Sequence, residues 1–402
     1  MTGSSNADYY KKIFFLAAGF YFVVGYSNVS YFLPVYYAQI GYTPEAAGLL
    51  VSAFFLTSVT VRPFLGLIIP ILGFRKVLYA AGLIGVLGSV GVALPGPCFW
   101  AALISRAALG LASGSFQVGL ATFQAFVFSE SARGRAYSLI TVGGLLPMMT
   151  LVPLADWLLF RNLYSTYILV PLFSSLMALA IIPFIPELSS TVVPRGQGAG
   201  SYFRSMAECF KLPAFKVALL AFFLFCLTDA TSAFMAGMTR HYGLMASFFL
   251  SSNALVGVCV RLFGARLLDR FPRWKLSLPC IVITAGTLFL ATINPTETSL
   301  VMLGLIFGIG MGFGFPVHVA LISDSVPQRL QPQAISTSWF FMGLDFAAVP
   351  LLMGALGNSL GPVTAFRHIC GFTLILAFCS VFLWKAALKS KASDSDRPSE
   401  TP

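Results

Sequence analysis

Twelve apolar stretches dominate the chain, and each is long enough for a helix that crosses a membrane, which needs roughly 20 residues with a range of about 17–25. The hydrocarbon core holds no water, so a crossing segment must satisfy its own backbone hydrogen bonds, as an α-helix does. Only 10% of the residues are charged, compared with about 25% in an average soluble protein, which excludes a soluble fold. The stretches comprise residues 13–37, 46–68, 77–95, 98–128, 137–160, 166–186, 214–239, 244–265, 276–293, 299–322, 333–357 and 366–385.

A long polar segment after the sixth stretch divides the twelve into two sets of six. We therefore predict an all-α integral membrane protein with twelve transmembrane helices in two six-helix bundles. The predicted domains are an N-terminal bundle at 1–187, a cytoplasmic linker loop at 188–213, a C-terminal bundle at 214–385 and a disordered cytoplasmic tail at 386–402.

The positions of Lys and Arg predict the orientation, because loops rich in these residues stay on the cytoplasmic side of a membrane. With the N-terminus inside, the segments that would be cytoplasmic hold most of the 25 Lys and Arg residues. The opposite loops hold only Arg161, Arg240 and Arg367. We therefore place both termini in the cytoplasm. The net charge of +11 follows from this topology, so we expect the lipid bilayer, and not nucleic acid, as a partner.

The two halves also resemble each other at an offset of about 199 residues. The segment RPFLG at 62–66, followed by FRK at 74–76, corresponds to RLFGA at 261–265, followed by RWK at 273–275. Such repeats are typical of transporters, in which two similar bundles rock about a site held between them. We therefore expect bundles related by a pseudo-two-fold axis along the membrane normal.

The loop after the second stretch of the C-terminal half reads ARLLDRFPRWK at 265–275. It resembles the loop motif of the major facilitator superfamily, G-x-L-x-D-R-x-G-R-[RK]-x, with alanine and proline in place of the two glycines. Its N-terminal counterpart, GLIIPILGFRK at 66–76, keeps the glycines and the basic pair but lacks the acid. The resemblance implies a cytoplasmic gate, whereas the alternative is a pair of ordinary basic loops. The candidate gate residues are Gly66, Arg75, Lys76, Asp269, Arg270, Arg273 and Lys275.

The fourth stretch contains RAALGLASG at 106–114, which resembles the R-x-x-x-G motif that the same family carries on its fourth helix. An arginine within a membrane costs at least about 2.5 kcal/mol, so Arg106 should face a cavity or a partner and not lipid. We expect Arg106 to take part in proton coupling or to bind an anionic group of the substrate. The alternative is a structural ion pair with Asp156 on the next stretch.

Two acids lie near the middle of predicted helices, Asp229 in the seventh stretch and Asp345 in the eleventh. Burial in a medium of low dielectric constant favours the protonated acid, whereas access to water allows it to ionise. A carboxyl group that is exposed alternately to the two sides can therefore carry a coupling proton. We predict that both acids are proton sites, with a purely structural role in helix packing as the alternative.

A stripe of polar and aromatic residues on the first stretch suits the wall of a cavity. Tyr21, Asn28 and Tyr31 recur at steps of seven and three, which places them on one helical face. Gln117 lies on the same face of the fourth stretch as Arg106. Rings supply apolar area, and hydroxyl and amide groups orient a solute. We predict that Tyr21, Asn28, Tyr31 and Gln117 line the substrate cavity, with a location at the membrane interface as the alternative.

The resemblance implies secondary active transport of a small solute by alternating access. We favour proton-coupled export by an antiporter of the bacterial inner membrane, because the segments FLPVYY and AAGL resemble bacterial efflux members. The fifth stretch lacks the G-x-x-x-G-P-x-x-G-G pattern of drug antiporters, so import of a nutrient stays open. A non-transporting receptor or assembly factor is a further alternative.

The sequence contains no motif for ATP binding or for enzymatic chemistry. We therefore expect no enzyme activity and no metal or organic cofactor. The expected partners are a small-molecule substrate, protons and the bilayer, and we expect a monomer.

Overall fold

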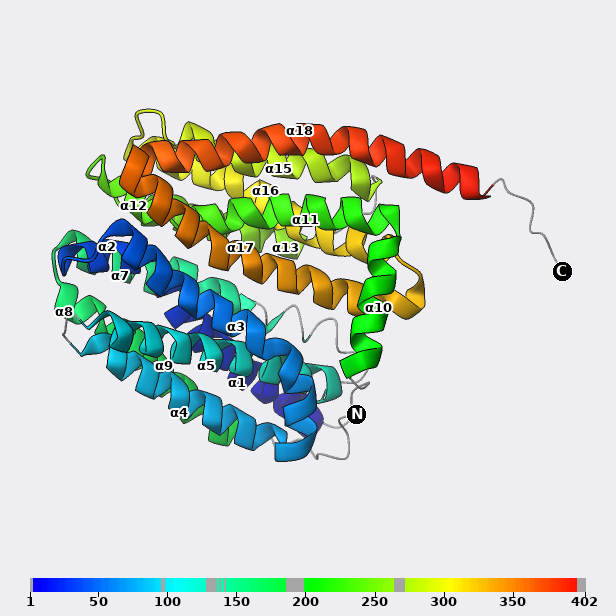
Figure 1. The fold of residues 1–402 in the computed structure, drawn as a ribbon. Helices are drawn as coiled ribbons and strands as arrows, with labels where there is room; N and C mark the ends of the chain where they lie inside the picture. Colours follow the sequence, from blue (N-terminus) through cyan, green and yellow to red (C-terminus); the bar gives the residue numbers. More distant parts are fainter. Residues whose placement is uncertain are drawn as a thin grey trace.

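The computed structural model describes residues 3–94, 98–127, 136, 139–140, 142–185, 199–263 and 272–395. Throughout these residues the regular structure consists of helices, without strands. Figure 1 shows them as two stacked bundles, with the N-terminal half in blue to green below and the C-terminal half in green to red above. The predicted all-α fold with two bundles is confirmed.

Six segments of membrane-crossing length form the N-terminal half, and three of them combine shorter helices. Pro34, Pro147 and Pro183 stand at the starts of such short helices, where the missing N–H breaks no helical hydrogen bond. The elements are α1 (Gly3–Val29), η1 (Ser30–Phe32), α2 (Leu33–Gln39), α3 (Pro44–Leu72), α4 (Phe74–Ala93), α5 (Phe99–Val127), η2 (Leu146–Met149), α7 (Leu151–Phe160), α8 (Tyr164–Tyr167), α9 (Leu169–Ile181) and η3 (Ile182–Phe184).

The C-terminal half repeats this arrangement. Its elements are α10 (Ala199–Lys211), α11 (Pro213–Ser232), α12 (Met235–Arg240), α13 (Ser247–Phe263), α15 (Arg273–Leu290), α16 (Glu297–Asp324), η4 (Gln328–Leu330), α17 (Gln331–Leu360) and α18 (Pro362–Ser395). Within the described chain, eleven segments are long and apolar enough to cross a membrane. The twelfth is α13, whose apolar part, Ser247–Val260, is shorter. These segments coincide with the twelve predicted stretches.

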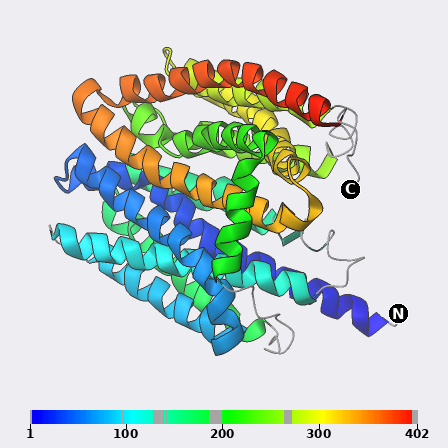
Figure 2. The ribbon, with the colours of Figure 1, turned by 45° about the vertical axis from the view of Figure 1, so that its right-hand side comes forward.

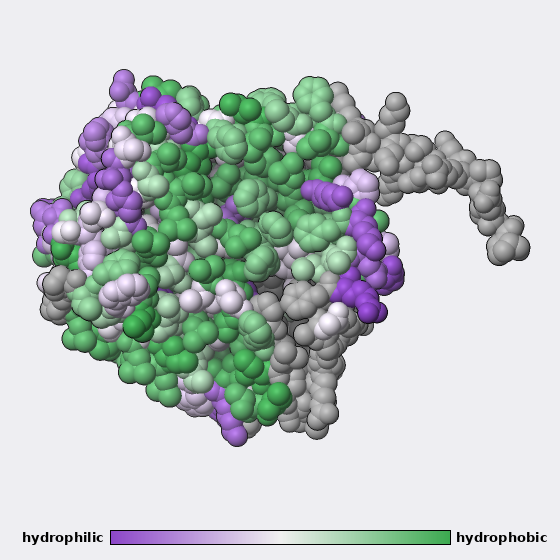
Figure 3. Space-filling model, viewed as in Figure 1, coloured by the Kyte–Doolittle hydropathy of each residue, from purple (hydrophilic) through white to green (hydrophobic). Residues whose placement is uncertain are grey.

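The surface agrees with a membrane-crossing protein. In Figure 3, hydrophobic residues form a broad band across the middle of the molecule, and hydrophilic residues gather toward the left and right ends. Many of the exposed side chains are large and apolar, such as Phe14, Leu87 and Phe382. Lipid is the solvent that accommodates such a surface.

Glycines let the second and fourth helices of each half pack backbone to backbone. Gly110 of α5 lies against the carbonyl oxygen of Phe54 in α3, and Gly308 of α16 lies against the carbonyl oxygen of Asn253 in α13. The two contacts are related by about 199 residues in both partners, which is the offset of the sequence repeat. Small residues are needed at such contacts because helix association in membranes depends on close packing.

Replacing Gly110 by valine should lower the thermal stability, because a Cβ atom there overlaps the Phe54 carbonyl group. Overpacking of this kind lowers the free energy of unfolding by about 1–3 kcal/mol. The contact is with main-chain atoms of α3, which cannot give way as a flexible side chain can. The matched control is Gly257→Val in α13, since a Cβ there meets open space. Thermal unfolding of the purified variants in detergent gives the comparison. Equal melting temperatures for the two variants would contradict the packing argument.

The two halves meet closely at one end of the molecule. We call this end, where α2 and α12 lie, the loop face, and the opposite end, with α10 and the start of α1, the terminal face (Figure 1). Near the loop face, η1 and α2 contact α12. Between α3 and α17, Ser52 Oγ donates a hydrogen bond to Ala347 O at 2.6 Å. Between α13 and η2, Ser251 Oγ donates to Met148 O at 3.1 Å.

Toward the terminal face, the described buried side chains form separate cores. One cluster extends through the N-terminal half and includes loop-face residues of the C-terminal half, such as Phe234 and Phe366. A second cluster contains residues of the C-terminal half only, such as Phe222 and Ile322. The packing of the two halves is therefore continuous at the loop face, as expected of two bundles that open toward the terminal face.

Two segments are more helical than expected. Part of the predicted linker loop forms α10, which runs across the long helices and not along them (Figure 2). Glu208 of α10 forms an ion pair with Arg329 at 2.8 Å, and the rings of Phe210 and Phe341 lie 6.4 Å apart. α10 is thus docked on the C-terminal half. Helix α18 continues to Ser395, well into the segment expected as a disordered tail.

Candidate substrate cavity and proton sites

The structure brings three predicted site residues together where the two halves meet. Asp345 of α17 and Asp229 of α11 lie within electrostatic range of each other, and Tyr31 of η1 lies within the same range of Asp229. Cys226, one turn before Asp229, lies near both acids. Because α11 and α17 belong to the C-terminal half and η1 to the N-terminal half, this acidic cluster includes groups of both bundles.

The two acids differ in their surroundings. Asp345 is completely buried, and neither oxygen of its carboxyl group has a hydrogen-bond partner among the described residues. Asp229 is only partly buried. Burying an ionised carboxylate without a partner costs far more than burying a neutral acid. The surroundings of Asp345 therefore favour its protonated form, while Asp229 keeps some access to the outside of the protein.

A break in the first transmembrane segment places Tyr31. The helix α1 ends at Val29, a single 3₁₀ turn covers Ser30–Phe32, and α2 begins with Leu33 and Pro34. Proline has no N–H to donate, so one hydrogen bond of a regular α-helix is missing at this point. The turn contacts α12 of the C-terminal half, and Tyr31 thereby lies near Asp229.

Arg106 lies apart from this cluster, inside the N-terminal half. Its Nε donates to Leu50 O at 3.2 Å, and one terminal nitrogen donates to Ser30 Oγ at 3.0 Å. The guanidinium carbon lies 4.7 Å from the ring centre of Phe54. The side chain is 1% exposed, and its second terminal nitrogen has no hydrogen-bond partner among the described residues.

Asp156, the alternative partner for Arg106, is engaged elsewhere. Its Oδ2 accepts a hydrogen bond from the N–H of Ser247 at 2.7 Å, and Arg240 donates to its main-chain oxygen at 3.4 Å. Both partners belong to the C-terminal half. The charge of Arg106 is therefore stabilised by a main-chain oxygen, a hydroxyl group and a ring, and the ion pair with Asp156 is not formed.

Two of the remaining cavity residues, Tyr21 and Gln117, make polar contacts within the N-terminal half. The hydroxyl groups of Tyr21 and Thr150 lie 2.8 Å apart, which links α1 to the fifth transmembrane segment. Gln117 accepts a hydrogen bond from Arg62 at 3.4 Å. Asn28 is buried, with 6% of its surface exposed. The sequence analysis used Arg62 only as part of the repeat. Gln117 lies 55 residues further along the chain, and a contact at that separation leaves no local signal in the sequence.

Two gate residues of the loops bind within their own halves. Arg75 donates to Pro183 O at 2.7 Å, which joins the start of α4 to η3. Arg273 forms an ion pair with Asp324 at 2.7 Å, which joins the start of α15 to the end of α16. Asp324 was not predicted as a partner, since its position at a helix end gave no hint of the loop that it would contact.

The described part of the chain also contains three other gate residues, without a bridge of this kind. Lys76 and Lys275 are exposed, and Gly66 lies within α3. Asp269 and Arg270 lie outside the described residues.

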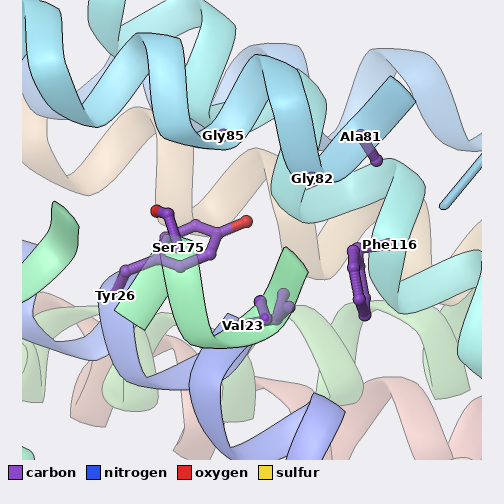
Figure 4. A pocket seen from close by; sticks show the side chains of 8 residues that line it. Val23, Tyr26, Ala81, Gly82, Gly85, Phe116 and Ser175 are labelled. Carbon is purple, nitrogen blue, oxygen red and sulfur yellow. The ribbon is translucent and has the colours of Figure 1, made fainter. Parts of the chain in front are cut away.

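A small recess between α1, α4, α5 and α9 is too narrow to admit a water molecule (Figure 4). Val23, Tyr26 and Phe116 line it, together with Ser175 on α9, which is drawn beside Tyr26, and with Gly82 and Gly85 of α4. Its lining residues all belong to the N-terminal half, so it is a packing space inside one bundle and not a site between the two.

Two repeated helical bundles with buried charged groups at and near their interface define a membrane transporter and not an enzyme. The sequence model of the Major Facilitator Superfamily matches residues 15–315 and 217–402, and the chain belongs to this family. No curated protein sequence matches the chain significantly.

Solved structures of three transporters share the fold. A nucleoside transporter, NupG, solved as a point mutant, has a TM-score of 0.75 at 14% identity, covering 93% of this chain and 98% of the other. A peptide transporter, POT, solved with sulfate, has a TM-score of 0.73 at 13% identity, covering 94% and 95%. A bacterial homologue of the human lysosomal transporter Spinster, inward-facing and unoccupied, has a TM-score of 0.69 at 14% identity, covering 97% and 99%.

Proposed function

We propose that this transporter exports a small organic solute in exchange for protons, with Asp345 and Asp229 as the proton sites. The observation that carries the proposal is the complete burial of Asp345 without a hydrogen-bond partner among the described residues. Binding of a proton neutralises such a carboxylate, which then needs no positively charged partner. An acid of this kind within a membrane is usually functional. The interaction with Asp229 adds a second acid through which the proton can reach the outside of the protein.

The same cluster supports exchange as the mode of coupling. Tyr31, a predicted cavity residue, lies near Asp229, so a solute that contacts this part of the cavity also meets the proton sites. Proton and solute then compete for one region, and each leaves when the other binds. Such competition is the linkage that antiport requires.

The orientation completes the proposal. We place both termini in the cytoplasm, as the distribution of Lys and Arg indicates. The terminal face is then the cytoplasmic side. In the state described here the halves are joined at the loop face, and this state takes up solute from the cytoplasm. Asp345, Asp229 and Tyr31 come from the two halves of one chain, so a monomer contains the whole acidic cluster.

The test is solute-induced proton movement in vesicles that contain the purified protein. The probes are a dipeptide, a nucleoside, a sugar and an organic amine, each added separately, with an internal pH-sensitive dye as the readout. We expect at least one solute to drive protons in the opposite direction to its own flux and to be accumulated when a pH gradient is imposed. Flux that ignores the gradient would remove proton coupling, and movement of solute and protons in the same direction would replace export by import.

A further inference from the structure

A helix cap crosses from one half of the molecule to the other at the loop face. Asp156, near the end of α7, accepts a hydrogen bond at 2.7 Å from the N–H of Ser247, the first residue of α13. The first N–H groups of a helix have no partner within the helix, and a negative charge beside them is stabilised by the helix dipole. Asp156 thus satisfies one of the free N–H groups at the start of α13, as the side chain of a residue just before a helix usually does for the second or third N–H.

The local sequence leaves this helix start without a cap of its own. The residue before Ser247 is Ala246, which has no side-chain acceptor. Two other helices that start at the loop face are capped locally. Thr43 accepts a hydrogen bond at the start of α3, and Thr296 forms a reciprocal pair with Ser299 at the start of α16. The cap of α13 therefore depends on the N-terminal half.

The polar contacts of Asp156 are in turn made with the C-terminal half. Its side chain is 1% exposed. Oδ2 accepts the hydrogen bond from the N–H of Ser247, and Oδ1 has no hydrogen-bond partner among the described residues. Arg240 of α12 donates to its main-chain oxygen, and the Arg240 guanidinium lies 5.1 Å from the ring centre of Phe160. The positive groups around this carboxylate, the start of α13 and Arg240, thus belong to the other half. When the halves separate at the loop face, the hydrogen bond between the Asp156 carboxylate and the N–H of Ser247 is broken.

We propose that Asp156 helps to hold the two halves together at the loop face, which we call the loop-face gate, by capping α13 in the state opened toward the terminal face. Each transport cycle must break this bond and form it again, so its strength helps to set the balance between the two states. This role follows from the fold and does not depend on which solute or ion is carried.

The experiment measures how often the loop face opens. A single cysteine, Ser52→Cys, serves as the reporter, because Ser52 is buried between α3 and α17 while the gate is closed. The seven native cysteines are first replaced, and a charged thiol reagent is supplied on both sides of the membrane in the absence of solute. In this background, Asp156→Ala should raise the labelling rate about tenfold or more, since a hydrogen bond to a charged group is among the stronger ones.

A second variant changes the partner of Asp156 and keeps the carboxylate. Ser247→Pro deletes the N–H that Asp156 accepts, and proline is well tolerated as the first residue of a helix. It should therefore raise the labelling rate as Asp156→Ala does. Asp156→Asn keeps an acceptor oxygen without the charge and should give an intermediate rate. If Asp156→Ala does not fold, these two variants carry the test, and each is checked for a single elution peak before labelling.

Glu297→Ala is the matched control, because Glu297 is also an acid at a helix start on the loop face, but its helix is capped within its own half. Its labelling rate should equal that of the parent. A parental rate in Ser247→Pro, or an equal rise in Glu297→Ala, would overturn the proposal. Because the readout needs no solute and no proton gradient, failure of the proton-coupled mechanism would leave this result intact.

Discussion

Asp345→Asn should abolish solute accumulation driven by a pH gradient, while exchange of solute down its own gradient continues. Asparagine cannot bind and release a proton, so the variant stays permanently in the neutral form that the buried site favours. The carboxyl oxygens of Asp345 accept no hydrogen bond from the described residues, and the amide therefore loses no contact. We expect accumulation to fall to the level seen without a gradient, and the melting temperature to stay close to that of the parent protein.

The matched control for this prediction is Asp324→Asn in the same half. Asp324 is about half exposed and pairs with Arg273 at the terminal face, and a surface pair of this kind contributes less than about 1 kcal/mol. Its loss should leave gradient-driven accumulation intact. Vesicle uptake with and without a pH gradient provides the measurement. Full accumulation in Asp345→Asn, together with normal exchange, would show that the coupling proton is carried elsewhere.

The transmembrane architecture was predictable because a membrane imposes it on the sequence. A crossing helix must be apolar over nearly its whole length, so each of the twelve segments is visible as a stretch of sequence. The pairing of helices was also partly visible. The repeat at Arg62 and Arg261 predicted two equivalent halves, and the glycine contacts of Gly110 and Gly308 have the same offset.

The contacts of the candidate sites were not predictable, because they join residues far apart in the chain. Asp156 and Ser247 are 91 residues apart, and their contact depends on how two helices of different halves meet. The periodicity of a helix gives the face on which a residue lies but not the element that covers this face. For this reason the sequence could place Asp229, Asp345 and Tyr31 within spans, but it could not show that they come together.

The docked helix α10 was missed for a different reason. The segment that contains it is polar on average, and average polarity led to the prediction of a loop. The helix is amphipathic, with Cys209 buried and Glu208 paired to Arg329. A periodic pattern within a polar segment was the signal that could have revealed it.

Arg106→Met should leave the protein folded and at least as stable, but reduce transport about tenfold or more. Methionine has a similar length and needs no hydrogen bond. Replacing a buried charged group by a well-packed apolar one is often neutral or stabilising in proteins. Arg106 has no carboxylate partner among the described ion pairs and one unpaired terminal nitrogen, so its burial contributes little net stability. Ser30, its hydroxyl partner, keeps a second hydrogen bond to Tyr26 O.

The loss of transport should follow from the position of the partners that Arg106 holds. It joins α5 to Leu50 of α3 and to Ser30 of η1, and the next residue, Tyr31, lies near Asp229. Without the guanidinium, the turn that carries Tyr31 loses its link to α5. Arg106→Lys should give an intermediate loss, because one ammonium group cannot reproduce the fixed fork of a guanidinium.

Two measurements together decide this role. Thermal unfolding reports the stability of Arg106→Met, and solute affinity measured apart from the maximal rate of transport reports the position of η1. A stable variant with weakened solute affinity assigns Arg106 to positioning the cavity wall. A variant that melts at a much lower temperature, with unchanged affinity in the folded fraction, would make Arg106 a structural residue of the N-terminal bundle.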